Sequence, residues 1–439
     1  MKHPVKTLAA LAFLGVMAPT AHAVSIKDDV LSLTPGVRIQ TRAQMNDATT
    51  GTAATTAAGI TSNNGPGTDF RVASGTPGAT DDAIDFMLRR ARIYMNFKYG
   101  SNWKGQIAIH ADGVDNSATN ANRGMNLRYA WLERGFDMGD GISHGITFGL
   151  NKPYNNATDS AMSSSREMMP NSFASASYLA PRGVGAGYRF YHPVFMIAAD
   201  LQNNTNGTKD TTPDTSATSF NNGDEKEGFF YGVRAEFSLS PDWFIKKRSE
   251  SFVGKEGQGL NIGLSYGMNQ DAVLADVDAS GATAPGKRNL SAYGIDALFW
   301  LNGISAFAEY RTGTQESERN DGISTAASAA NTGTADVDAE FISFQIGYAM
   351  PLGEEVIEPC IRYQIIDNNT DADETVNYST AAQGSTATDS GQSGTQIDFG
   401  VNYYLNGHDH KLHLAVSLWE SEEGQGDATI VRLQHQINF

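Results

Sequence analysis

Basic side chains recur at alternate positions along extended stretches of the sequence. In Phe86–Tyr99 one parity carries Arg90 and Arg92, and the other parity, which contains Met87, is apolar except for Arg89. A β-strand places alternate side chains on opposite faces, so this stretch predicts a strand with one cationic and one apolar face. Guanidinium groups bind carboxylates and phosphates through a planar fork of N–H donors. Arginines that share a face could therefore attract or bind anions.

Further arginines fall on the polar parity of other predicted strands. The set expected to face the lumen is Arg38, Arg42, Arg90, Arg92, Arg128, Arg189, Arg234, Arg311, Arg362 and Arg432. The acids expected on the same parities are Asp112, Asp200, Glu236, Asp296, Glu309 and Asp398. Arg128 is expected to lie opposite Tyr129 and Trp131. Rings of arginine favour anions, whereas arginines paired with these acids would order the wall and give weak selectivity. The sequence leaves both interpretations open.

About sixteen stretches alternate in this way. They are residues 33–44, 86–99, 103–112, 125–135, 144–152, 183–191, 194–202, 228–239, 260–268, 290–301, 304–311, 341–350, 357–367, 397–405, 411–419 and 428–439. Long polar connections, among them Gln270–Arg288, alternate with tight turns such as Asn302-Gly303, which suits a type I′ hairpin. Aromatic residues recur at strand ends, and Phe439 closes the last stretch. This organisation predicts an all-β protein, a transmembrane antiparallel β-barrel of about 16 strands with long extracellular loops and short periplasmic turns, rather than a soluble β-sandwich.

The start and the composition of the chain predict an exported protein. Residues 1–23 combine a basic start, an apolar run and the small-residue site Ala21-His22-Ala23, which together have the form of a signal peptide. The 439 residues include 32 basic and 49 acidic ones, so nucleic acid is not an expected partner. Cys360 is the single cysteine and is expected to be a small buried or lipid-facing residue. We expect the protein in the outer membrane of a Gram-negative-type envelope, in contact with lipid and lipopolysaccharide.

The interior of a barrel with this many strands is too wide for side chains to fill, so an aqueous channel should remain. The connection Pro153–Arg182 is the third long loop. It carries apolar residues that a solvated loop would not favour, which are Met162, Met168, Met169, Phe173, Tyr178 and Leu179. Folding into the lumen would bury them, narrow the pore and place Arg166 near the constriction. The alternative is a surface loop that caps the barrel or contacts a neighbouring subunit.

Several stretches resemble, in their order and spacing, a known family. They are FMLRRARIYMNFKYGSNWKGQIAIHAD, NLRYAWLERGF, ITFGLNKPYN, SSREMMPNSF with APRGVGAGYRF, DALFWLNGISAFAEYR and GVNYYLNGHDHKLHLAVS. The chain resembles the phosphate-selective porins O and P. The resemblance implies a 16-stranded homotrimeric porin whose third loop folds into the lumen, with an anion constriction to which Arg38, Arg89, Arg90 and Arg92 correspond by position. Members selective for phosphate line the external mouth with lysines, whereas the loops here are rich in acids. Those acids could form a solvated face or bind divalent cations that bridge to lipopolysaccharide.

Passive diffusion of small hydrophilic solutes, with a preference for anions and with phosphate as one candidate, is the predicted function. The residues expected at the constriction are Arg38, Arg89, Arg90, Arg92, Arg128 and Arg166, and those expected on the lumen wall are Arg42, Arg234, Arg311 and Arg362. The alternative is a weakly selective porin for neutral solutes such as sugars. A barrel enzyme would need a nucleophile with a positioned His and carboxylate, and no such constellation is recognised, so no catalytic residue, metal or cofactor is expected. An adhesive barrel of few strands would be plugged, and conductance would distinguish it from a porin.

Overall fold

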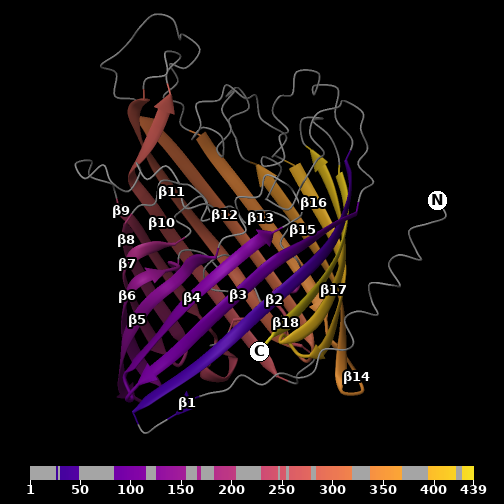
Figure 1. The fold of residues 1–439 in the computed structure, drawn as a ribbon, viewed down its shortest axis with the longest axis horizontal. Coiled ribbons are helices and arrows are strands. Elements are labelled where there is room, and N and C mark those ends of the chain that lie inside the picture. Colours follow the sequence, from indigo (N-terminus) through magenta and orange to yellow (C-terminus); the bar gives the residue numbers. More distant parts are fainter. Residues whose placement is uncertain are drawn as a thin grey trace, which may run out of the picture.

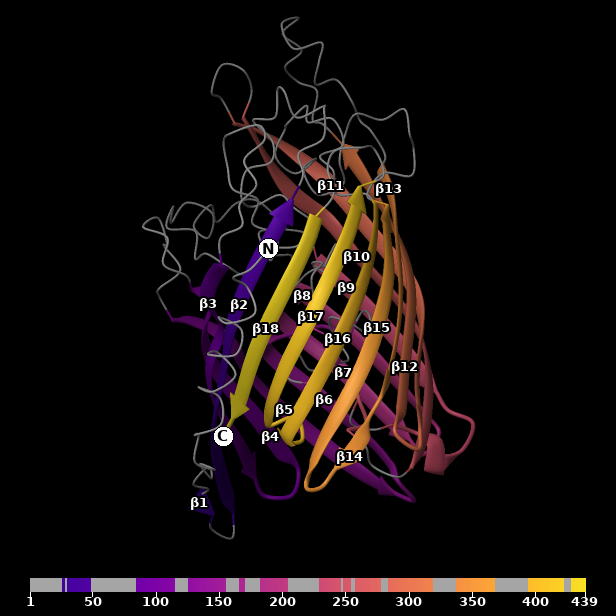
Figure 2. The ribbon, with the colours of Figure 1, turned by 90° about the vertical axis from the view of Figure 1, so that its right-hand side faces the viewer.

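Sixteen antiparallel strands form the wall of a closed barrel in the computed structural model (Figures 1 and 2). The structure describes residues 26–27, 30–48, 84–114, 125–154, 166–169, 182–203, 229–245, 248–253, 257–277, 283–318, 337–367, 394–421 and 428–439. The strands of the wall are β2 (Leu31–Ala48), β3 (Ile84–Tyr99), β4 (Trp103–Val114), β5 (Asn126–Gly139), β6 (Ile142–Asn151), β7 (Gly183–His192), β8 (Phe195–Asn203), β9 (Phe229–Phe237), β10 (Gln258–Val277), β11 (Thr283–Leu301), β12 (Ile304–Glu318), β13 (Val337–Tyr348), β15 (Glu355–Asp367), β16 (Gly394–Asn406), β17 (His410–Ser421) and β18 (Ala428–Asn438).

Each wall strand pairs with its neighbours in chain order, and β18 pairs with β2, which closes the ring. Two short pieces, β1 (Ile26–Lys27) and β14 (Met350–Leu352), pair with β2 and β15. Closure supplies both edge strands with partners. The predicted antiparallel barrel of about 16 strands is confirmed.

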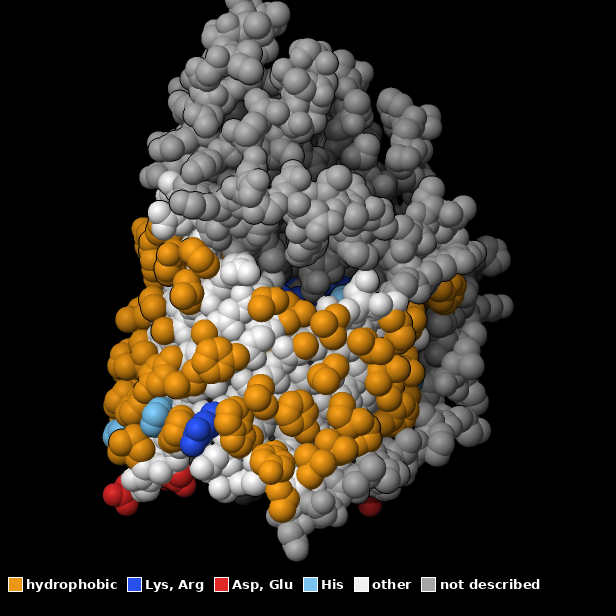
Figure 3. Space-filling view, turned by 60° about the vertical axis from the view of Figure 1, so that its left-hand side comes forward, with side chains coloured by type: hydrophobic (Ala, Val, Ile, Leu, Met, Phe, Trp, Pro, Cys, Tyr) orange, Lys and Arg blue, Asp and Glu red, His pale blue; other side chains and the backbone are white. Residues whose placement is uncertain are grey.

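Side chains alternate between the lumen and the outer surface along the strands, as β10 shows. Leu264 and Tyr266 are 48 % and 41 % exposed, whereas Ser265 between them is 8 % exposed. Hydrophobic side chains gather in a broad band on the outer face (Figure 3). A chain that crosses hydrocarbon must pair every backbone N–H and C=O, and a closed sheet with an apolar outer band satisfies this requirement.

Among the residues that the structure describes, no helix has the length and hydropathy needed to span a bilayer.

A β-bulge in β3 reverses the parity predicted for the first part of this strand. The register against β2 shifts between Gln40 and Thr41, which makes Arg89 an extra residue in β3. Before the bulge, Phe86 lies outside and is 57 % exposed, while Met87 lies inside and is 8 % exposed. The prediction that Met87 lies on the face opposite Arg90 is therefore wrong, since both side chains face the lumen. A one-residue shift moves side chains to the other face, and strict alternation in the sequence does not reveal it.

A second bulge, at Arg128 in β5, has the same effect. The register against β4 shifts between Ala108 and Ile109, so Tyr129 pairs with Ala108. Ala108 is 4 % exposed and faces the lumen. Tyr129, and Trp131 two residues later, therefore share the lumen side with Arg128, whereas the sequence predicted that they lie opposite it.

The wall is uneven in height. Strands β10 and β11 have 20 and 19 residues, whereas β7 and β8 have 10 and 9 (Figure 1). The prediction of a loop over Gln270–Arg288 is wrong, because β10 and β11 stay paired up to Val277 and Thr283 after a register shift between Asn269 and Ala272. Residues 270–288 lack the alternation of apolar and polar side chains that predicts the other strands.

Short turns gather at the end of the barrel where the C-terminus lies (Figures 1 and 2). Asn302 and Gly303 have φ values of 46° and 89°, the left-handed conformation that a type I′ turn needs at both positions, as predicted. The connection between β9 and β10, residues 238–257, is the long one at this end of the barrel. It begins with a 3₁₀ turn, η4 (Pro241–Trp243). We call it the 238–257 connection.

Candidate functional site

Four residues of the loop between β6 and β7, Arg166–Met169, lie inside the lumen. They reach β16 and β17, which stand across the ring from β6 and β7. Lys411 Nζ on β17 donates a hydrogen bond to the backbone carbonyl of Glu167 at 2.8 Å. Asn402 Nδ2 on β16 donates to the backbone carbonyl of Met168 at 2.7 Å. Residues 155–165 and 170–181 of the predicted constriction loop lie outside the described residues.

The two methionines of this loop are seated in the wall. Met168 and Met169 are 0 % and 1 % exposed and pack against Cys360, which therefore faces the lumen rather than lipid. Glycines leave room for their sulfur atoms. A Cβ added at Gly347 would lie 2.9 Å from Met168 Sδ, and one added at Gly400 would lie 2.7 Å from Met169 Sδ. The wall is thus shaped to receive the loop.

Glu167 turns its carboxylate toward β3. Its two oxygens accept hydrogen bonds from Nη1 and Nη2 of Arg90, each at 3.2 Å. Burial by itself would raise the pKa of Glu167, but the charge and hydrogen bonds of Arg90, followed by the charges of Lys411 and Arg89, lower this pKa below its ordinary value. Glu167 is therefore a carboxylate anion held on a cationic wall at neutral pH.

Positive charge is concentrated on one side of the lumen, which we call the cationic sector. It consists of the lumen-facing positions of β17, β18, β2 and β3, and its basic residues include Lys411, Arg432, Arg38, Arg42, Arg90 and Arg92. Several of their hydrogen bonds go to neutral amides. Arg42 Nε and Nη2 donate to Gln434 Oε1 at 3.1 and 2.8 Å, and Arg38 Nε donates to Asn438 Oδ1 at 3.1 Å.

Two of these arginines face each other directly. Arg38 and Arg92 are register partners across β2 and β3. Like charges at directly opposed positions destabilise a sheet. An anion close to these arginines offsets such repulsion, as the carboxylate of Glu167 does at Arg90.

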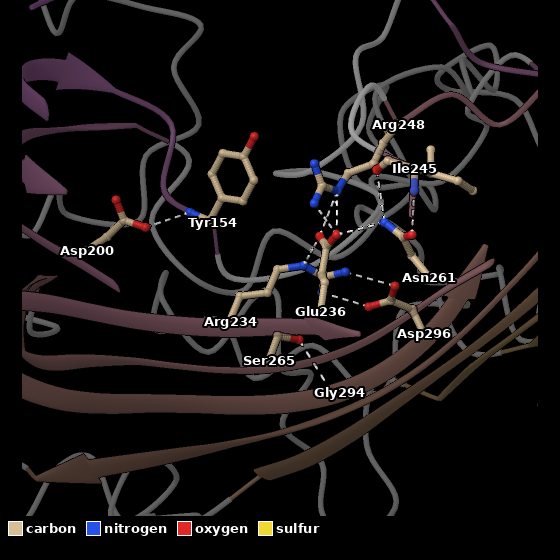
Figure 4. Close-up of polar contacts among 10 residues, drawn as sticks. All are labelled: Tyr154, Asp200, Arg234, Glu236, Ile245, Arg248, Asn261, Ser265, Gly294 and Asp296. Carbon is tan, nitrogen blue, oxygen red and sulfur yellow. Dashed lines mark hydrogen bonds and ion pairs between the residues drawn. The ribbon is translucent and has the colours of Figure 1, made fainter. Parts of the chain in front are cut away.

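Four arginines on the strands from β7 to β15 lie next to carboxylates: Arg189, Arg234, Arg311 and Arg362. Arg234 donates through Nη1 and Nη2 to Asp296 at 2.7 and 2.8 Å and through Nε to Glu236 at 2.9 Å (Figure 4). Two further pairs are Arg189–Asp200 at 2.7 Å and Arg362–Asp398 at 2.7 Å. We call this side the paired sector. The sequence left two interpretations of the lumen arginines open. On this side of the wall the arginines pair with lumen acids, which is the second of them.

The other predicted arginines are placed differently. Arg128 Nη1 lies 3.3 Å from His110 Nδ1 on β4, beside the cationic sector. Arg311 Nε lies 3.7 Å from Glu309 Oε1, within the paired sector. Arg166 is half-buried in the loop. Of the six arginines predicted at the constriction, Arg38, Arg90 and Arg92 lie close together on β2 and β3.

Sequence reasoning missed two charged residues of the 238–257 connection. Arg248 Nε donates to both oxygens of Glu236, at 2.8 and 2.6 Å (Figure 4). Glu250 Oε2 accepts a hydrogen bond from the backbone N–H of Met168 at 2.9 Å. The signal in the sequence was the unusual length of this connection on the short-turn side.

Two stretches match the Gly-x-Ser-x-Gly pattern of hydrolases, at residues 141–145 and 263–267. Ser143 lies in β6 and Ser265 in β10, where its hydroxyl donates to the carbonyl of Gly294 at 3.4 Å. That pattern signals a nucleophile only at a strand-to-helix turn, so neither match supports an enzyme. No group of three or more His, Cys, Asp or Glu side chains among the described residues could hold a metal ion.

Comparison with known proteins supports the fold. No protein-family model matches the sequence, and no curated protein is similar to it in sequence. Among solved structures, the outer membrane channel DcaP of Acinetobacter baumannii is 13 % identical, with a TM-score of 0.51 over 95 % of this chain and 100 % of that one. Salmonella typhi OmpF is 12 % identical (TM-score 0.52, 94 % and 100 % covered), and Pseudomonas putida OprB is 12 % identical (TM-score 0.52, 94 % and 95 % covered). These likenesses show an outer-membrane barrel fold, and the resemblance to phosphate-selective porins stays a prediction.

Proposed function

We propose that this protein is an outer-membrane porin, a water-filled channel through which small hydrophilic solutes diffuse with a preference for anions. The observation that supports this proposal is the cationic sector, which faces the loop residues Arg166–Met169 inside the lumen. A segment that crosses the lumen leaves less width for solutes, so permeating ions pass close to Lys411 and the arginines of β2 and β3. Fixed positive charge on one wall of a narrow aqueous passage raises the local concentration of anions.

Small carboxylates and inorganic phosphate are the solutes that this wall would favour, because a guanidinium matches the geometry of both. The bidentate contact between Arg90 and Glu167 shows the carboxylate case within the protein itself. Phosphate, a homotrimeric assembly and a surround of lipid and lipopolysaccharide are proposed from the resemblance to phosphate-selective porins. The second candidate is a weakly selective porin for neutral solutes, which the paired sector favours because its charges balance.

The reversal potential in a KCl gradient across a planar bilayer tests the proposal. We expect the potential of the wild-type channel to follow chloride and the current to fall when phosphate is added at low concentration. Arg90→Gln should lower the ratio of anion to cation permeability. The double variant Arg362→Gln/Asp398→Asn removes one charge of each sign and should leave that ratio unchanged.

Each other result has a defined meaning. Near-equal ion permeability of the wild-type channel would reject the anion preference and support the weakly selective porin. An absence of conductance from folded protein would reject the channel altogether.

A further inference from the structure

The 238–257 connection enters the lumen from the short-turn end of the barrel. Phe244 and Ile245 are 8 % and 4 % exposed. The backbone of Ile245 exchanges two hydrogen bonds with the side chain of Asn261 on β10, at 2.8 and 3.0 Å (Figure 4). With the contact between Arg248 and Glu236, these bonds fix the first half of the connection against β9 and β10.

The second half of the connection lies across the lumen. Trp300 Nε1 on β11 donates to the carbonyl of Ser249 at 3.1 Å, and the N–H of Phe252 donates to Ser305 Oγ on β12 at 2.8 Å. Ser249 Oγ also lies 2.9 Å from Nε2 of His408, in the turn between β16 and β17. Strands β10 and β17 are far apart in the ring, so a segment attached near both must cross the interior.

This connection meets the loop that enters from the other end. The N–H of Glu250 donates to the carbonyl of Arg166 at 3.3 Å, and Glu250 Oε2 accepts from the N–H of Met168 at 2.9 Å. Glu250 is 3 % exposed. A carboxylate from the short-turn side thus satisfies a buried backbone donor of a loop that belongs to the long-loop side.

We propose that the 238–257 connection is a second constriction element and that Glu250 is a positioning residue, which holds Arg166–Met169 against the cationic sector. The narrow passage would then be an assembly of two segments from opposite ends of the barrel rather than the product of one loop. The inference goes beyond the proposed function and rests on it only where current is measured.

The consequence of removing this carboxylate follows from hydrogen-bond energetics. A buried N–H that loses its acceptor carries the desolvation penalty of the unpaired group. Arg166–Met169 would then leave its seat more often, and the backbone amide of Met168 would exchange with solvent through these openings. The width of the passage would fluctuate at the same time.

Hydrogen exchange and single-channel recording of the full-length protein test the inference. In Glu250→Ala we expect the Met168 amide to exchange about tenfold faster than in wild type, and the open-channel current to gain partial closures. Glu250→Gln keeps an oxygen acceptor and should lie closer to wild type. Asp242→Ala is the matched control, because Asp242 is an exposed acid of η4 in the same connection, and it should change neither readout.

Wild-type exchange at Met168 in a folded Glu250→Ala barrel would overturn the inference. Where Glu250→Ala fails to fold, Ser305→Ala gives a second test, because it removes the acceptor for Phe252 and loosens only the connection. Unchanged exchange at Met168 in that variant would also overturn it. Hydrogen exchange at Met168 is measured independently of channel current. An unselective or non-conducting channel would therefore contradict the proposed function without contradicting this inference.

Discussion

At the scale of the residue, the contribution of an ion pair depends on how far its charges are removed from water. The side chains of Arg234 and Asp296 are 1 % and 4 % exposed, and their N–O distance is 2.7 Å. The pair Lys104–Glu133 has a similar distance, 2.8 Å, but its lysine side chain is 50 % exposed. Removal of one partner should therefore lower the free energy of unfolding much more in the buried pair than in the exposed pair.

We expect Arg234→Met to lower the free energy of unfolding by about 3–5 kcal/mol, because it leaves the Asp296 carboxylate buried without the guanidinium that pairs it. Lys104→Met should cost less than about 1 kcal/mol, since water already screens that pair. Urea unfolding of the two variants in the same detergent or lipid compares them. Equal losses would show that the paired sector is as well hydrated as the surface.

At the scale of the element, Glu250 makes the contact between the two lumen segments dependent on pH. Burial, followed by the nearby Glu167 carboxylate, raises the pKa of Glu250 to about 7. The hydrogen bonds from Gln345 and from the Met168 backbone, and then the charge of Arg362 on β15, oppose this shift. Lys411 on β17 and Cys360 on β15 are two further titratable groups that interact electrostatically with Glu250. A carboxyl with a raised pKa loses stabilisation as the pH rises, because a released Glu250 ionises near its ordinary value while the seated one must ionise next to Glu167. Above pH 7 the seated Glu250 is itself ionised, and the contact then carries the full free-energy cost of a buried carboxylate next to Glu167.

The contact between the segments should therefore be weaker at pH 8 than at pH 6. We expect more partial closures in single-channel records at pH 8, and a flat response between these values in Glu250→Gln, which does not titrate. Closures that became more frequent toward pH 6, or the same pH response in the Gln variant, would contradict this account.

The strands could be predicted from the sequence because an outer face in lipid and an inner face in water impose alternation on every one of them. The hairpin at Asn302-Gly303 was predictable for a similar reason, since few residue pairs adopt its backbone conformation. The bulge at Arg89 was not, because an extra residue changes the register without changing composition. The inner parts of β10 and β11 were predicted as strands, but their outer parts, within residues 270–288, were missed because they lack an apolar parity.

The candidate site was predictable only in part. Alternation correctly placed Arg38 and Arg92 on the polar parity, but their direct opposition depends on the register between two strands, which neither strand specifies alone. The contact between Glu250 and Met168 depends on two segments far apart in the sequence that meet within the lumen. Such a tertiary contact leaves no local pattern.

At the scale of the whole molecule, the apolar outer band should determine stability in a bilayer. Leu264 lies on the outer face of β10 and is 48 % exposed, whereas Leu239 follows β9 at the short-turn rim and is 74 % exposed. We expect Leu264→Arg to cost about 2–4 kcal/mol and Leu239→Arg at most about 1 kcal/mol, because a cation is costly within hydrocarbon and tolerated near the interface. Reversible unfolding in lipid vesicles measures both values. The same loss at the two positions would argue against a hydrocarbon layer around β10.

The contacts of Arg166–Met169 also set the order in which the barrel can mature. Glu167 and Lys411 are 244 residues apart in the sequence, and Met168 and Asn402 are 234 apart. Contacts across such separations form late, and these need β16 and β17 already in the sheet. Before β16 and β17 join the sheet, Arg166–Met169 lacks these two hydrogen-bond donors. The lumen of the unfinished barrel would therefore be less constricted than that of the finished one.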